Sequence, residues 1–157
     1  MTKLLLSIHV LASILLIGPI AVAASLFPRY ARRADAGSAG AVALLHRICV
    51  GYAVVGVTVP VFGIATGARL GVLTDAWLIT SIVLTAVAAA ILALAILPGQ
   101  ARMMEPAGGD AEAGTGAETT TTARAAARLA GLTGVFNLLW AAVVVLMIVR
   151  PGSTTGA

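Results

Sequence analysis

The sequence has 157 residues, of which 60% are hydrophobic and 10% are charged, and its formal net charge is +4. A soluble domain carries roughly 25% charged residues, so this composition excludes a chain whose surface lies mainly in water. The single cysteine excludes an intramolecular disulfide and a two-cysteine metal clip.

Four apolar segments fill most of the chain. They cover residues 4–27, 42–70, 77–97 and 124–149, and the apolar run of the last begins at residue 129. Each segment holds the roughly 20 residues that an α-helix needs to cross about 30 Å of hydrocarbon. We therefore predict an all-α fold, a four-helix transmembrane bundle with antiparallel up-down topology that forms one membrane domain over residues 1–157.

The first segment shares features with a signal peptide, because it follows Lys3 and offers small residues at 23–25. Its apolar run is, however, longer than the roughly 7 to 15 residues of a signal peptide. The run also contains His9 and the pair Gly18 and Pro19, which suit a packed bundle. We expect a retained first helix.

Basic residues set the expected orientation. An antiparallel arrangement places both termini and the connection 71–75 on one side, and the connections 28–41 and 98–122 on the other. Seven of the ten basic residues fall on this second side: Arg29, Arg32, Arg33, Arg47, Arg102, Arg124 and Arg128. The positive-inside rule assigns that side to the cytoplasm, so both termini are predicted to be extracytoplasmic. Because topology accounts for the positive charge, no nucleic-acid partner is expected, and the lipid bilayer is the expected surrounding.

The three connections differ in character. Residues 98–122 are rich in Gly, Ala, Thr and Glu and are predicted to form a flexible cytoplasmic loop. Residues 71–75 are so few that the second and third helices must be antiparallel neighbours. The arginines of 28–41 are interpreted first as topology signals and second as a site for lipid or a partner.

The two histidines are the strongest candidates for chemistry in the spans. His9 is predicted to lie below the outer interface, where an ionisable side chain is costly and indicates a functional site by default. Two interpretations stay open: a neutral imidazole bonded to Ser13 or to a neighbouring helix, or an axial ligand of a haem or a metal. His46 is expected at the cytoplasmic interface. The two imidazoles lie on the order of 14 Å apart along the membrane normal, which argues against one haem bound by both.

Other residues indicate helix packing. Asn137 lies in the middle of the fourth segment, where its amide needs partners; an interhelical hydrogen bond is the first interpretation, and a pore or ligand contact is the second. Small residues recur at four-residue spacing as Gly63 with Gly67 and as Ala130 with Gly134. Such pairs let helix backbones approach closely, so these four residues are predicted to pack helices together.

Familiar catalytic motifs are absent from the sequence. It contains no HExxH, GxxxxGK[ST] or CxxC pattern and no serine nucleophile elbow, so neither a catalytic residue nor a metal-ligand set is predicted. No Asp, Glu or Lys lies in the four apolar segments, which argues against a proton-coupled exporter. Whether the protein is an enzyme stays open on this basis.

A series of short features runs along the chain in a fixed order. The series comprises His9 followed by Gly18, an arginine-rich exit at 29–33, Pro60 followed by Thr66 and Gly67, Trp77 opening the third segment, Leu97 and Pro98 closing it, and residues 147–151 closing the fourth. Over nearly the whole chain this order resembles a bacterial family of predicted integral membrane proteins of unknown function. The resemblance implies a multi-pass protein of the bacterial inner (plasma) membrane.

A more distant likeness concerns the first helix. A histidine followed by a glycine and a basic exit is similar to the membrane-integral protoporphyrinogen oxidases and the copper-resistance D proteins, which are also helical bundles. In that oxidase group the first-helix histidine is implicated in binding haem b. The resemblance implies that His9 would be the axial ligand in this chain.

Three classes of function stay open. The first is a structural or accessory four-helix bundle that packs against a membrane protein partner or a second copy of the chain. The second is a haem b-binding membrane oxidoreductase, or a haem-handling protein, that uses His9. The third is a small-molecule transporter with an uncharged pore around Asn137.

Overall fold

The structure is a computed structural model that describes residues 2–33, 36–105 and 115–152. The regular structure of these residues is entirely helical, and four stretches are long and apolar enough to cross a membrane. We name them spans 1 to 4, and they cover Lys3–Ala31, Gly37–Leu70, Ala76–Met104 and Thr120–Val149. The prediction of an all-α fold with four membrane helices is confirmed.

Span 1 consists of two α-helices joined by a wider turn. A π-helical turn, η1 (Ser13–Ile17), connects α1 (Thr2–Ala12) to α2 (Gly18–Ala31). Pro19 lies in the first turn of α2, two residues after the π turn ends, and a proline has no N–H and crowds the carbonyl one turn earlier. The π turn makes room for the proline, so the helix continues instead of ending.

Span 3 repeats this pattern. The π turn η2 (Leu92–Ile96) joins α5 (Ala76–Ile91) to α6 (Leu97–Met104), and Pro98 lies in the first turn of α6. A missing N–H is well tolerated there. Residues 98–104, predicted to begin a flexible loop, are therefore helical, whereas residues 106–114 of that predicted loop lie outside the described residues.

Span 2 is interrupted near its middle. Helices α3 (Ala36–Gly56) and α4 (Thr58–Leu70) meet at Val57, whose N–H bonds the Val54 carbonyl at 3.4 Å. Pro60, three residues later, cannot donate to the helix, which explains the irregular turn. Helix α4 ends at Gly71, whose φ of 72° is a left-handed conformation that favours glycine.

Span 4 belongs to a single continuous helix, α7 (Thr115–Val149), which has no internal proline. Its start lies before residue 124, within the predicted loop. It ends one residue before Arg150, which precedes Pro151; a residue that precedes proline disfavours helical geometry.

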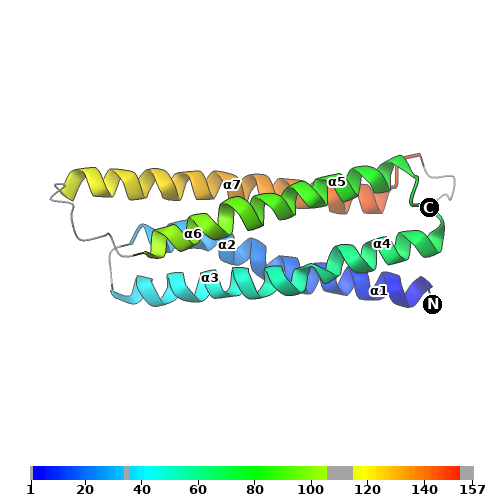
Figure 1. Cartoon of the computed structure of the whole chain (residues 1–157), viewed down its shortest axis with the longest axis horizontal. Helices are drawn as coiled ribbons and strands as arrows, with labels where there is room; N and C mark the ends of the chain where they lie inside the picture. The colour runs from blue at the N-terminus through cyan, green and yellow to red at the C-terminus, as the bar shows by residue number, and fades with distance from the viewer. Residues whose placement is uncertain (1, 34–35, 106–114, 153–157) are drawn as a thin grey trace.

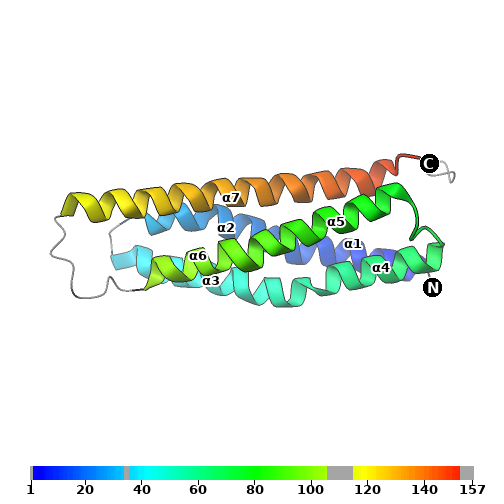
Figure 2. The ribbon, with the colours of Figure 1, turned by 45° about the horizontal axis from the view of Figure 1, so that its top comes forward.

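The helices pack in two pairs (Figures 1 and 2). Helix α2 packs along α3 and α1 along α4, so span 1 pairs with span 2, while α5 packs along α7. Contacts of α2 with α7 and of α3 with α6 join the two pairs.

The end of α7 lies at the same end of the bundle as the start of α1 (Figure 1). We name this the terminal end. The opposite end, where α2 and α6 finish and α7 begins, carries Arg29, Arg102 and Arg124, and we name it the basic end.

A narrow core joins the pairs. Its centre contains Ile20, Ala24, Cys49, Ile96 and Phe136, which come from all four spans and are almost fully buried. Only 17–22% of each span's apolar window is buried, so most of the span surface faces outward. Lipid chains are as apolar as these side chains, so close packing and polar contacts, more than burial of apolar surface, must hold the helices together.

Candidate functional site

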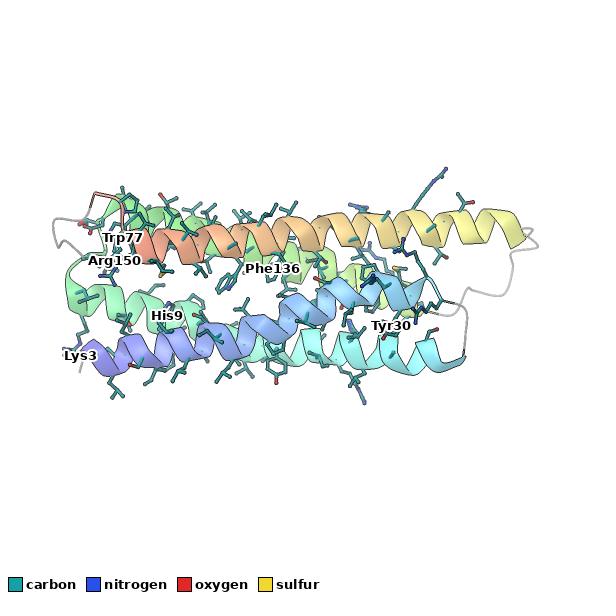
Figure 3. The ribbon with its side chains drawn as sticks, turned by 180° about the vertical axis from the view of Figure 1, so that it is seen from behind. Lys3, His9, Tyr30, Trp77, Phe136 and Arg150 are labelled. Atoms are coloured by element: carbon teal, nitrogen blue, oxygen red, sulfur yellow. The ribbon has the colours of Figure 1, made fainter. Side chains whose placement is uncertain are left out.

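His9 lies between spans 1 and 2, near the terminal end (Figure 3). Its Nδ1 is 2.9 Å from the Val59 carbonyl oxygen of α4, and because a carbonyl only accepts, Nδ1–H is the donor. The imidazole lies against Gly63, where a Cβ would be 2.8 Å from His9 Cε1. A glycine is therefore required at this position if the ring is to reach the neighbouring backbone.

Ser13, considered above as a partner for His9, makes a different contact. Its hydroxyl donates to the backbone carbonyl of His9 at 2.8 Å, within its own span. The side-chain partner of His9 comes from the neighbouring helix instead. The structure therefore has the hydrogen bond to a neighbouring helix, which is one of the two arrangements considered above for a packing histidine.

The haem interpretation of His9 stays a prediction, and the surroundings of the ring can be compared with what a haem ligand needs. The bond from Nδ1 to Val59 leaves Nε2 as the nitrogen that could bind a metal, and the edge of the ring that carries Cε1 and Nε2 packs on Gly63. A haem needs a flat cavity beside its ligand, and neither of two surface hollows, one between α6 and α7 and one beside Leu16 and Tyr52, is lined by His9. Among the described residues, no three His, Cys, Asp or Glu side chains group as metal ligands. We derive no chemistry through a bound haem.

His46 belongs to a second polar cluster, near the basic end. Its Nδ1 lies 3.0 Å from Gln100 Oε1, and Gln100 Nε2 donates to Cys49 Sγ at 3.6 Å. Gln100 and Cys49 are fully buried. This cluster joins α3 of span 2 to α6 of span 3 and is formed by side chains alone.

Sequence reasoning missed Gln100. It is the only glutamine in the sequence, but it follows Pro98 and Gly99, a pair typical of loops. The helix was therefore predicted to end at Leu97. A lone amide just beyond an apolar span was the available signal that a polar contact lies there.

Asn137 and Thr133 lie on one face of α7, near mid-span. Asn137 Nδ2 donates to Ser25 Oγ of α2 at 3.3 Å, which links span 4 to span 1. Asn137 Oδ1 and Thr133 Oγ1 are buried and have no hydrogen-bond partner in the described part of the chain. The Asn137 amide therefore makes an interhelical hydrogen bond through its nitrogen, while its oxygen has no partner among the described residues.

The two small-residue pairs behave differently. A Cβ on Gly67 would lie 2.8 Å from Leu78 Cδ2 of α5, so both Gly63 and Gly67 lie at close contacts between helices. Ala130 and Gly134 are exposed on α7, and the space around Gly134 is open within the described residues. The first pair packs helices of this chain, whereas the second faces outward.

Aromatic and charged groups meet at the terminal end. Trp77 Nε1 donates to Asp75 Oδ2 at 3.0 Å, and the Arg150 guanidinium lies 5.6 Å from the centre of the Trp77 ring. Figure 3 shows Trp77 and Arg150 close together at this end. The contact joins the start of span 3 to the residue that follows span 4.

Comparison with known proteins gives a family. Residues 3–151 match the model of a family described as predicted integral membrane protein (DUF2269). No curated protein and no solved structure matches the chain. The likeness of the first helix to the protoporphyrinogen oxidases and the copper-resistance D proteins therefore stays a prediction. The resemblance to a family of predicted integral membrane proteins is confirmed, and the chain belongs to the DUF2269 family.

Proposed function

We propose that this protein is a structural or accessory component of the bacterial plasma membrane, whose embedded polar side chains hold its helices together. The observation that carries the proposal is the bond from His9 to the Val59 carbonyl. This bond joins the ring of His9 to the backbone of the neighbouring helix α4. The contacts from His46 to Gln100 and from Asn137 to Ser25 act in the same way elsewhere in the bundle.

The energetics favour this role. A hydrogen bond between membrane helices contributes roughly 0.6 to 2 kcal/mol, and lipid offers an unpaired imidazole or amide no alternative partner. Each contact joins two different spans, and the bundle that these spans form has only a narrow core. The polar groups therefore specify which helix faces meet.

The accessory part of the proposal requires a partner within the membrane. Ala130 and Gly134 support it, because they form a small-residue pair that faces outward from α7. Such a pair lets another helix approach closely, from a membrane protein partner or from a second copy of the chain. Cross-linking from Gly134→Cys in a Cys49→Ser background in native membranes tests this. Cross-linked species are expected, and a chain that stays uncross-linked contradicts the accessory role.

An absorbance spectrum distinguishes the structural role from haem binding. The protein, purified from cells supplied with a haem precursor, is compared with His9→Ala and with the matched control His46→Ala, each oxidised and reduced. The proposal expects no Soret band in any of the three and a lower melting temperature for both variants. A Soret band that is lost only in His9→Ala would overturn the proposal in favour of a haem protein.

The orientation is proposed from the charge distribution. The basic end is assigned to the cytoplasm and both termini to the opposite side, following the positive-inside rule. A Thr154→Cys variant in the Cys49→Ser background is treated with an impermeant maleimide in intact cells. We expect labelling, and protection that disappears when the membrane is opened would reverse the orientation.

A further inference from the structure

A groove lies between α6 and α7 at the basic end. Its volume is about 730 Å³, and we name it the α6–α7 groove. Arg102 of α6 and Arg128 of α7 line it, together with Glu105, and its apolar part includes Leu94, Leu129 and Leu132. The structural role proposed above assigns nothing to this groove.

The lining changes character along the groove. Helix α6 runs toward the basic end and α7 runs away from it, so Arg102 and Arg128 both lie nearer that end than Leu94 and Leu132 do. At about 1.5 Å per residue, Leu94 lies roughly 12 Å deeper than Arg102 along its helix. One end of the groove is therefore cationic, and the other is apolar.

The groove opens sideways to the bilayer. Leu94, on its apolar wall, is 78% exposed, and both arginines are exposed as well. Helices α6 and α7 come into close contact at Gly99, because a Cβ at this position would lie 2.8 Å from Leu129 Cδ2. The contact between a glycine and a leucine keeps the helices close at that level and leaves room beside it.

The charge of the groove selects an anion. Among the lining residues that the structure describes, there are two guanidinium groups and one carboxylate, that of Glu105, so the described lining carries a net charge of +1. Guanidinium groups bind phosphate oxygens through paired, charge-assisted hydrogen bonds. The leucines below them offer an apolar surface at the depth of the acyl chains.

We propose that the α6–α7 groove binds an anionic phospholipid from the leaflet at the basic end. Arg102 and Arg128 hold the headgroup phosphate, and an acyl chain lies along Leu94 and Leu132. The apolar wall distinguishes this ligand from a free phosphate compound, which would use the arginines alone.

The test measures lipid binding to the detergent-purified full chain by native mass spectrometry. Phosphatidylglycerol is compared with zwitterionic phosphatidylethanolamine and with glycerol 3-phosphate. Binding of phosphatidylglycerol is expected to weaken about 30-fold in Arg102→Gln with Arg128→Gln, and about fivefold in each single variant. Equal binding of the two lipids, or equal binding of glycerol 3-phosphate, would overturn the proposal.

Two further variants separate a site from general charge attraction. Arg32→Gln with Arg124→Gln removes the same charge from the basic end without touching the groove lining, and it should bind phosphatidylglycerol as the unchanged chain does. Ala95→Phe narrows the groove while keeping both arginines, and it should weaken binding. A control that loses as much affinity as the groove variant, or an Ala95→Phe chain that binds normally, contradicts the proposal. Size-exclusion chromatography shows that each variant is folded and monodisperse.

Discussion

The two histidines form different kinds of hydrogen bond toward opposite ends of the bundle. At the terminal end, His9 bonds to a backbone carbonyl, and the contact depends on the absence of a side chain at Gly63. Toward the basic end, His46 bonds to the side chain of Gln100, which in turn donates to Cys49. The first contact depends on the space that Gly63 leaves for the ring, and the second depends on the amide group of Gln100. The two ends should therefore be sensitive to different substitutions.

The largest expected effect is at Gly63. Gly63→Ala places a Cβ where the His9 ring lies, so the ring must move and its bond to Val59 is lost. We expect the free energy of unfolding to fall by about 2 kcal/mol, from overpacking and the lost bond together. Thermal or denaturant unfolding in detergent measures this.

Gly134→Ala is the matched control, because the same methyl group enters open space. Its free energy of unfolding should stay within about 0.5 kcal/mol of the unchanged chain. Equal losses in the two glycine variants would show that the close approach at Gly63 does not matter. Adding His9→Ala to Gly63→Ala should cost less than the sum of the two single changes, because the ring that clashes is gone.

The next effect is at Gln100. Gln100→Leu keeps a side chain of similar size but leaves His46 Nδ1 without its partner. We expect a loss of about 1.5 kcal/mol in the free energy of unfolding. A double-mutant cycle with His46→Phe should give a coupling of about 1 kcal/mol. Strictly additive losses would mean that the bond between His46 and Gln100 contributes nothing.

A smaller effect is expected at the terminal end. Arg150→Gln removes the cation over the Trp77 ring and should lower the free energy of unfolding by about 0.5 kcal/mol. Arg69→Gln serves as the control, because it removes one cation at the same end of the bundle. If the two variants unfold alike, the contact between Arg150 and Trp77 is not stabilising.

The smallest effect should have the opposite sign. Thr133→Val replaces a buried hydroxyl that has no hydrogen-bond partner among the described residues with a methyl group of the same shape. The free energy of unfolding is expected to stay level or rise by up to about 0.5 kcal/mol. A clear loss of stability would show that the Thr133 hydroxyl is satisfied, for example by buried water.

The four spans could be predicted from sequence because length and hydropathy determine them. Leu97 was predicted as the end of span 3 because Pro98 and Gly99 follow it, and a π turn that carries a helix through a proline has no clear sequence signal. The partners of His9 and His46 depend on how each helix is rotated about its axis. A nearly uniform apolar surface does not encode that rotation, so Val59 and Gln100 could not be inferred. Gly63 and Gly134 look alike in sequence, and only their places on the helices separate them.

The most direct test of the account concerns the proton on the His9 ring. Nitrogen NMR of the protein labelled in histidine, with His46→Phe to simplify the spectrum, reports which ring nitrogen carries the proton. The account predicts a ring protonated on Nδ1, because that nitrogen donates to the Val59 carbonyl. A ring protonated on Nε2 alone, or one whose signals are displaced by a bound iron, would contradict it.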